Sequence, residues 1–377
     1  MTAFEVMRKH YEQRDLGARE WKENGGKVVG YIGSDVPEEM ILAAGFFPLR
    51  ISGDPSGATT LADKYMEPVF DPMVRSMFNR VLDGTYSFVD HLVISNSADA
   101  LVRFFYYLRE INHVDPHLAV PDFYFFDILR TRFRTSALYN RARTRELAEK
   151  LESWSEVRIT DEGLSQAIAV CNENRRLLEE VALRRVAEPP RLSGGDALRI
   201  TGSSMFMMKS EHNSLLRGLL SQADAFPRRS GVRLFVDGSA LDNLQLYEIV
   251  ESCDAIIVGE TTDWGNRYFE DAVSVNCNPW DGVVDRYHFK APAPSKYPVS
   301  VRAEYCVRRA LEAKAEGVIF FILAADDAPS WDYPEQRKAL EARGIPTLCL
   351  DKQPYRVSAV EELKSRVKAF VDETTKR

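Results

Sequence analysis

The sequence predicts an α/β fold of two doubly wound, Rossmann-like lobes with mostly parallel sheets, joined by a helical segment. Short apolar runs of strand length alternate with segments of helical periodicity in residues 1–137, and the same alternation returns in residues 196–377. Residues 138–195 between them show helical spacing of apolar and charged side chains without strand signals. Alternating strands and helices are typical of parallel sheets covered on both faces, with ligands at the carboxyl ends of the strands.

The N-terminal α/β lobe, residues 1–137, contains recognisable helix-start signals. Pro37 is suited to the first turn of a helix, and Glu38 and Glu39 favour the positive end of its dipole. Asn96 or Ser97 is expected to be the N-cap of a later helix. Strands are predicted at residues 27–32, 46–51 and 91–95, and helices at 36–42 and 98–111.

The helical segment, residues 138–195, is expected to end in a linker, because Pro189-Pro190 and Gly194-Gly195 are strong turn signals. The C-terminal α/β lobe, residues 196–377, then resumes the alternation. Strands are predicted at residues 198–202, 233–237, 255–259, 317–323 and 346–350, and helices at 211–223, 241–252, 300–316, 334–343 and 357–374.

The composition excludes several classes of protein. The chain has 377 residues, a net charge of −7 and no long basic run, so nucleic acid is not an expected partner. The N-terminus is charged throughout and no apolar stretch approaches the ~20 residues that span a bilayer, so neither export nor membrane contact is expected. Five scattered cysteines, an odd number, favour a reducing compartment, and we expect a cytoplasmic protein.

The common catalytic motifs are absent. The sequence contains no GxGxxG after a strand, no GxxxxGK[ST], no CxxC, no HExxH and no GxSxG. Dinucleotide binding through that fingerprint, P-loop ATP hydrolysis, the common zinc sites and the hydrolase nucleophile elbow are therefore not predicted.

Several segments do carry a resemblance, and their order and spacing make it more specific than any one of them. They are Tyr31–Arg50, Asp63–Tyr65, Pro72–Ser76, Asp90–Ser97, Gly265–Phe269 and Trp331–Pro334 followed by Gly344–Pro346. Together they resemble subunits of the 2-hydroxyacyl-CoA dehydratase and benzoyl-CoA reductase superfamily over nearly the whole chain.

The resemblance implies a pair of homologous subunits, in which acyl-CoA meets a [4Fe–4S] cluster held between two α/β lobes by three cysteine thiolates. It also implies a separate ATP-dependent activator that injects one electron. The electron converts the thioester carbonyl to a ketyl radical, which permits loss of a 2-hydroxyl group or, in related enzymes of anaerobic metabolism, reduction of an aromatic ring.

The chain departs from this pattern where the family has its three cysteines. These vacated cluster-ligand positions hold Asp71, Ala98 and, nearest to the third, Asp326 beside Ala325. Iron–sulfur clusters require thiolate ligands, with histidine an occasional substitute. We therefore expect no metal and no cofactor in this chain, and a [4Fe–4S] cluster in its partner subunit. Cys253, Cys306 and Cys349 are interpreted as small core residues.

Ser34 and Asp35 follow a strand and precede a helix, so they are candidates to bind an acyl thioester or a phosphate at a helix N-terminus. An ordinary N-cap is the alternative. The candidate catalytic residues are Asp71, Ser34 and Asp326, with the two carboxylates as general bases in the vacated cleft. The alternative for Asp71 is a carboxylate that is solvated or paired with Arg75 after the ligand was lost.

Four arginines are candidates for binding the phosphates of CoA, because a guanidinium matches phosphate oxygens in a fork. The four arginines are Arg50, Arg75, Arg103 and Arg267. Structural ion pairs are the alternative for each, and we expect only one or two to be ligands.

The aromatic run Phe104–Tyr107 either lines an acyl pocket or, as its helical spacing favours, belongs to the core.

Two classes of function follow. The favoured hypothesis is an accessory subunit that pairs with a cluster-bearing homologue and helps to enclose acyl-CoA. The alternative is a stand-alone acyl-CoA lyase or hydratase that uses acid–base chemistry through Asp71 or Asp326, or a non-catalytic CoA-ester binding protein.

Overall fold

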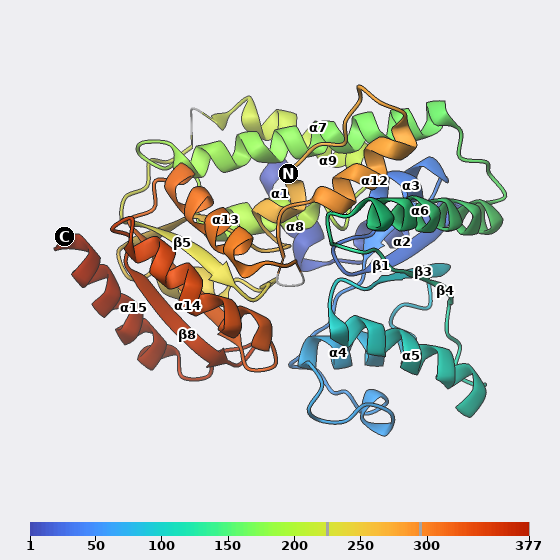
Figure 1. Ribbon diagram of the computed structural model, residues 1–377, viewed down its shortest axis with the longest axis horizontal. Helices are drawn as coiled ribbons and strands as arrows, with labels where there is room; N and C mark the ends of the chain where they lie inside the picture. Colours follow the sequence, from blue (N-terminus) through green and yellow to red (C-terminus); the bar gives the residue numbers. More distant parts are fainter. Residues whose placement is uncertain (224–225, 294–295, 377) are drawn as a thin grey trace.

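The computed structural model describes residues 1–223, 226–293 and 296–376, and it contains two α/β lobes bridged by a long helix (Figure 1). Each lobe contains one four-stranded parallel sheet. The predicted fold class, two Rossmann-like lobes with parallel sheets, is confirmed.

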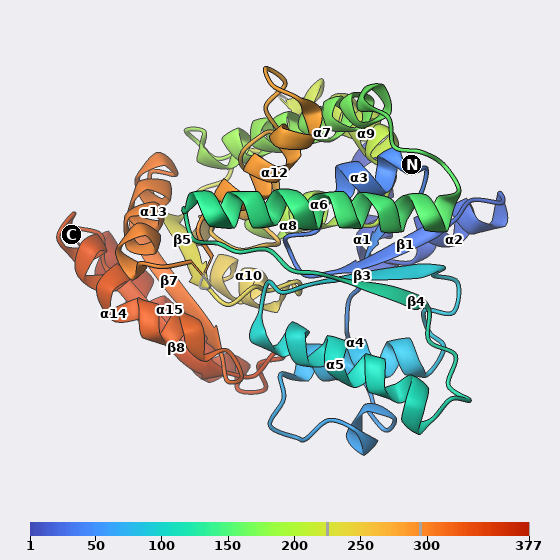
Figure 2. The ribbon, with the colours of Figure 1, turned by 45° about the vertical axis from the view of Figure 1, so that its right-hand side comes forward.

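The sheet of the first lobe has the strand order β2-β1-β3-β4. Its side chains alternate between two cores: Val28 and Ile32 face α4 and α5, whereas Val29 and Tyr31 face α3 and α6. Figure 2 shows α4 and α5 below this sheet and α6 across its other face. The elements are α2 (Leu16–Glu23), β1 (Val28–Ile32), α3 (Glu38–Ala43), β2 (Phe47–Arg50), a 3₁₀ turn (Ala62–Lys64), α4 (Pro72–Leu82), β3 (His91–Ser95), α5 (Asp99–Val114), β4 (Asp122–Phe126) and α6 (Arg134–Ser155).

The sheet of the second lobe has the order β6-β5-β7-β8. Leu234 and Val236 face α10 and α15, and Phe235 faces α13 and α14. The elements are β5 (Val232–Gly238), α10 (Gln245–Glu251), β6 (Ala255–Glu260), α11 (Asn266–Phe269), α12 (Pro279–Phe289), α13 (Val299–Glu312), β7 (Gly317–Leu323), α14 (Asp327–Glu341), β8 (Thr347–Gln353) and α15 (Val360–Thr375).

The two sheets share one topology. Counted within its own lobe, each sheet has the strand order second, first, third, fourth, so the order reverses between the first and third strands. In open α/β sheets the loops that leave such a reversal point at the carboxyl edge form the usual ligand crevice. Those loops follow β1 and β3 in the first lobe, and β5 and β7 in the second.

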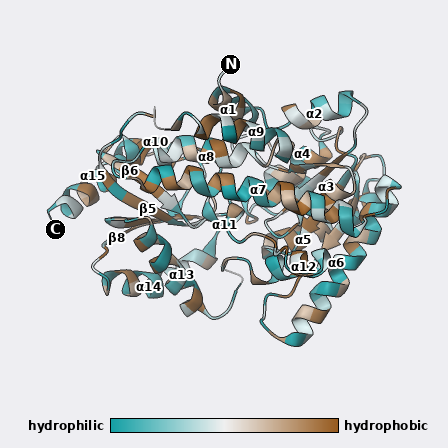
Figure 3. Ribbon diagram, turned by 90° about the horizontal axis from the view of Figure 1, so that it is seen from above, coloured by the Kyte–Doolittle hydropathy of each residue, from teal (hydrophilic) through white to brown (hydrophobic). Residues whose placement is uncertain are grey.

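Four helices join the lobes: α1 (Ala3–Glu12), α7 (Asp161–Val186), α8 (Gly194–Ser203) and α9 (Lys209–Leu220). Seen from above, α7 runs along the molecule over both lobes (Figure 3). Two of its arginines make buried ion pairs, Arg175 with Glu39 of the first lobe and Arg185 with Glu260 of the second. Helix α1 packs on α8 and α9 rather than on the first sheet, and α12 packs on α6 and α7.

The strand predicted at residues 198–202 is wrong, since these residues lie within α8. Ser193 is the N-cap of this helix, and its hydroxyl accepts a hydrogen bond from the backbone N–H of Asp196 at 3.0 Å. Gly194 and Gly195, predicted as part of a linker, form its first turn. The local cap therefore outweighs the β-branched residues that suggested a strand.

Pro37, predicted in the first turn of α3, is the N-cap of that helix, so Ser34 and Asp35 do not have the alternative role of its N-cap. The predicted N-cap of α5, Asn96 or Ser97, is wrong, because the N-cap is Ala98, which makes no side-chain cap hydrogen bond. Asn96 instead exchanges hydrogen bonds with the backbone of Ile128, while the Ser97 hydroxyl accepts from the Ser34 N–H. Both polar side chains thus fix the loop at the end of β3 to its neighbours. Across the described ranges, no helix combines the length and apolarity needed to cross a bilayer.

Candidate functional site

The carboxyl edges of the two sheets meet between the lobes. Arg50, the last residue of β2, donates to the carbonyl oxygen of Asp263 at 3.2 Å, and its guanidinium lies 4.6 Å from the ring centre of Trp264. The Nζ of Lys290, just after α12, donates to the carbonyl oxygen of Ser34 at 2.6 Å. The loop after β1 and the end of β2 are therefore held against segments of the second lobe.

All three positions at which the resemblance places cysteines are helix N-caps. Asp71 precedes α4, Ala98 precedes α5 and Asp326 precedes α14 in the other lobe. The Asp71 carboxylate accepts from the N–H groups of Met73 at 2.7 Å and Val74 at 3.1 Å. Helix N-termini carry a partial positive charge, so each of these positions favours a negatively charged group.

Asp71 and Asp326 interact electrostatically although they belong to different lobes. Burial raises the pKa of Asp71, against a smaller lowering by the Val74 and Met73 N–H groups. Burial also raises the pKa of Asp326, and the charge of Asp71 raises it further, while the Ser239 hydroxyl lowers it. Arg75 pairs with Asp63 rather than with Asp71. The charge of Asp71 therefore acts on the Asp326 carboxyl group of the other lobe.

A small polar chamber lies between residues of the two lobes, with a cavity volume of about 20 Å³. One side is formed by the loop after β1 and by Arg50, and the other by α11, α12 and the segments that flank them. Its lining residues are Tyr31, Gly33, Ser34, Val36, Glu38, Arg50, Arg175, Asp263, Tyr268, Arg286, Tyr287 and Lys290.

Carboxylates in and behind the chamber wall take part in buried ion pairs. Glu38 pairs with Lys209 at 2.8 Å, Asp263 pairs with Arg267 at 2.9 Å and Glu39, behind the wall, pairs with Arg175. Burial would lower the pKa of Lys209, but the Glu38 carboxylate outweighs burial and raises it. Tyr31 and Tyr268 both donate hydrogen bonds to Glu38, at 2.8 and 3.1 Å.

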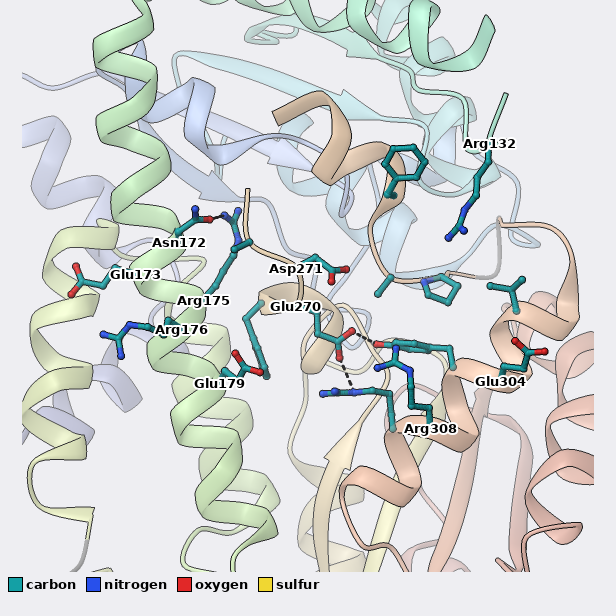
Figure 4. A pocket seen from close by; sticks show the side chains of 18 residues that line it. Arg132, Asn172, Glu173, Arg175, Arg176, Glu179, Glu270, Asp271, Glu304 and Arg308 are labelled. Atoms are coloured by element: carbon teal, nitrogen blue, oxygen red, sulfur yellow. Dashed lines mark hydrogen bonds and ion pairs between the residues drawn. The ribbon is translucent and has the colours of Figure 1, made fainter. Parts of the chain in front are cut away.

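A larger cavity, of about 920 Å³, lies between α7, α13 and the segment from α11 to α12 (Figure 4). Five arginines and five acidic residues line it, and its charges balance. Figure 4 shows Glu270 bonded to two neighbours, which are Tyr305 at 2.5 Å and Arg309 at 2.9 Å. Arg175, Arg176 and Arg308 also have carboxylate partners. A neutral cavity of paired charges gives little attraction for a polyphosphate.

The structure separates the six predicted substrate-binding residues. Ser34 and Arg50 line the chamber, and Arg267 lies behind it through Asp263. The other three lie in ion pairs: Asp35 with Arg130 at 2.5 Å, Arg75 with Asp63, and the exposed Arg103 with Asp99 at 3.0 Å. Their roles in binding stay predictions. In the aromatic run, Phe104 is fully buried against Phe78, whereas Tyr106 is half exposed.

Sequence reasoning missed Lys290, Arg286, Asp263 and Lys209. None of them lies in a motif, and they come from segments that are far apart in the chain. Glu38 was interpreted only as a favourable charge at a helix start, yet it is buried and pairs with Lys209 across 171 residues. No local pattern indicated this burial, because acidic side chains are almost never fully buried unless they are paired.

Comparison with known proteins now decides the family. Residues 34–373 match the family model described as 2-hydroxyglutaryl-CoA dehydratase, D-component. This chain belongs to that family. The resemblance expected from the motif segments is thereby confirmed at the level of the superfamily.

Relatives cover most of the chain at low identity. The (R)-phenyllactyl-CoA dehydratase beta subunit of Clostridium sporogenes is 24% identical over 93% of this chain and 92% of its own length. One of the benzoyl-CoA reductase subunits of Thauera aromatica is 28% identical over 82% of both chains. The (R)-2-hydroxyglutaryl-CoA dehydratase beta subunit of Acidaminococcus fermentans is 21% identical over 86% of this chain and 87% of its own length.

The side chains at the three N-cap positions do not fit an iron–sulfur cluster. They supply two carboxylates and a methyl group, and carboxylates are harder ligands than the thiolates that iron–sulfur clusters require. Cys171, Cys253 and Cys306 are buried and Cys277 is exposed. Among residues 1–223, 226–293 and 296–376, no three or more His, Cys, Asp or Glu side chains are grouped to hold a metal ion.

Proposed function

We propose that this chain is the cluster-lacking subunit of a heteromeric complex that resembles the 2-hydroxyacyl-CoA dehydratases or benzoyl-CoA reductases. It helps to bind and enclose an acyl-CoA substrate beside a homologous subunit that carries a [4Fe–4S] cluster. Family membership and the relatives, which are themselves named as subunits, support a partner. An ATP-dependent activator would then deliver its electron to that partner, in the cytoplasm.

The observation that carries the proposal is the chemistry of Asp71, Ala98 and Asp326 at three helix N-termini. Such termini stabilise thiolates, whose pKa they lower, and so they suit the cysteine ligands of an anionic cluster. Here the positive termini remain, but sulfur is missing from all three positions. The enclosing fold is therefore kept while the means of binding iron is lost.

The test is to express the chain alone and together with a cluster-bearing homologue, under anaerobic conditions. Iron content, visible absorbance and mass in solution are measured for both preparations. We expect no iron in the lone chain, and a stable complex with one cluster that dehydrates or reduces an acyl-CoA. A stoichiometric iron–sulfur chromophore in the lone chain would overturn the proposal, as would the failure of any homologue to bind it.

A second candidate function is favoured by the buried carboxyl groups of Asp71 and Asp326, since the charge of Asp71 acts on Asp326. General acid–base catalysis works best when the pKa of a carboxyl group is raised toward the operating pH, and burial raises the pKa of both groups. A lone chain with these groups would act as an acyl-CoA lyase or hydratase without iron.

Replacement of Asp71 by asparagine separates the two functions. The asparagine side chain keeps an oxygen that caps α4 but cannot exchange a proton, so the fold is preserved. Asp63→Asn, which changes the exposed partner of Arg75, is the matched control. A large loss of turnover in Asp71→Asn alone supports acid–base chemistry, whereas unchanged turnover in the active assembly removes Asp71 from the mechanism.

A further inference from the structure

Within the part of the chain that the structure describes, three cations of the inter-lobe chamber form no ion pair with a carboxylate. Glu38 and Asp263 in the wall and Glu39 behind it are each paired with a cation, so they neutralise one charge apiece. The cations that remain are Arg50 at the end of β2, Arg286 in α12 and Lys290 just after α12. Among the described residues, none of these three has a carboxylate oxygen within 4.0 Å.

Neutral groups accept the hydrogen bonds of these cations. Arg50 donates to the Asp263 carbonyl and to the sulfur of Met205, at 3.2 Å each. The Nε of Arg286 donates to the Asp271 carbonyl at 2.7 Å, and its Nη2 contacts two further carbonyl oxygens at 3.2 and 3.3 Å. Lys290 donates to the Ser34 carbonyl. Backbone carbonyls satisfy donors but do not neutralise a net charge.

The environment of Lys290 reflects this excess of positive charge. Lys290 and Arg286 are each only 6% exposed. Burial lowers the pKa of Lys290, and the nearby charge of Arg286 lowers it further, to about 8, although Asp35 and Asp263 act in the opposite direction. Unpaired charges in a buried site are unfavourable, so an anion in the chamber would relieve all three cations together.

The size of the chamber restricts the anion. A volume of about 20 Å³ is close to that of a single water-sized group, which requires about 10–15 Å³ on this measure. A CoA pyrophosphate is too large for it, whereas one end of a carboxylate fits and matches the forked donors of an arginine. Ser34, Asp263 and Tyr268 are partly exposed, so the chamber is not closed off from solvent.

We propose that this chamber is a binding site for a carboxylate, held by Arg50, Arg286 and Lys290. The carboxylate is either a free small acid or the end group of a larger substrate that occupies the space between the lobes. The site requires neither iron nor a partner subunit, so it stands or fails independently of the proposed function.

The experiment uses the full chain and two probes of the same shape, acetate and its uncharged analogue acetamide. Thermal unfolding is measured against probe concentration with the ionic strength held constant by sodium chloride, and saturation-transfer NMR of the probe methyl group reports binding directly. We expect acetate to raise the unfolding temperature in a saturable manner, because it binds the folded state, and acetamide to leave it unchanged. Equal responses to both probes would overturn the proposal.

Variants identify the site. Lys290→Met removes one charge-assisted hydrogen bond and keeps the length of the side chain, so acetate affinity should fall by about tenfold or more. Lys338→Met, at an exposed position on α14, is the matched control and should bind acetate normally. Arg50→Met, at the half-buried end of β2, serves if Lys290→Met does not fold. Unchanged acetate binding in the folded chamber variant would show that the carboxylate binds elsewhere.

Discussion

Replacement of Arg175 by methionine should cost this protein about 3 kcal/mol of unfolding free energy. The variant leaves the Glu39 carboxylate, which is completely buried, without its ion-pair partner. Burial would raise the pKa of Glu39, but Arg175 and then Arg286 outweigh it and lower the pKa from 4.5 to about 2. A difference of roughly 2.5 pKa units corresponds to ~3 kcal/mol, within the range measured when one partner of a buried pair is removed.

The pH dependence has a definite sign. The folded pKa of Glu39 lies below its value in the unfolded chain, so its contribution is complete above pH 4.5 and is lost as the pH falls toward about 2. The deficit of Arg175→Met relative to the natural chain should therefore be greatest near neutral pH and become smaller below pH 4.5.

The assay is equilibrium urea unfolding, followed by tryptophan fluorescence and far-UV circular dichroism at several pH values. Arg176→Met is the matched control, because Arg176 is the next residue of α7, is 57% exposed and pairs with Glu180 on the surface. Such surface pairs contribute ~0.5 kcal/mol or less. A double variant, Arg175→Met with Glu39→Gln, should recover part of the loss. Equal losses in Arg175→Met and Arg176→Met would refute the reasoning.

Three further predictions concern a cap, a second ion pair and the thiols. Asp71→Ala should lower the thermal stability of the isolated chain by ~1 kcal/mol through loss of the α4 cap, with Asp71→Asn close to neutral, and equal losses in both would contradict the cap. Arg185→Met should lower the unfolding free energy measured in urea by about 3–5 kcal/mol, because the Glu260 carboxylate, which Arg185 binds with two nitrogens, is left buried without its ion-pair partner. Adding Glu260→Met in the same chain should restore part of this free energy. A thiol reagent should label the exposed Cys277 rapidly in the native protein but Cys171, Cys253 and Cys306 only after unfolding, and rapid native labelling of all of these cysteines would disprove their burial.

Short apolar runs of strand length were sufficient to predict most strands. His91–Ser95 forms β3 with the predicted bounds, and the long helices α6 and α7 occupy the segment predicted to be helical. Residues 198–202 were misassigned because Ile200 and Thr201 favour strands locally. The decisive signal was Ser193, which caps α8 because its hydroxyl accepts from the backbone N–H of Asp196.

The candidate site was only partly predictable. Positions at the ends of strands, such as Ser34 and Arg50, follow from topology, since the carboxyl edge of a parallel sheet is where ligands bind. The partners of these residues do not follow, because Lys290 and Asp263 reach the same chamber from more than 200 residues away. Which charges are neutralised depends on tertiary pairing, and no local pattern in the sequence encodes it.

Helix α7 also determines how a substrate can enter. Arg175 and Arg185 are ten residues apart on it, or about 15 Å at the rise of an α-helix, and each is anchored to a different lobe. Because one continuous helix is attached to both lobes by buried ion pairs, it fixes the distance between the two sheets. Movement of the lobes toward each other would require one of these two ion pairs to break. We therefore expect a substrate to enter through an opening of constant width and to be selected by its shape at the entrance.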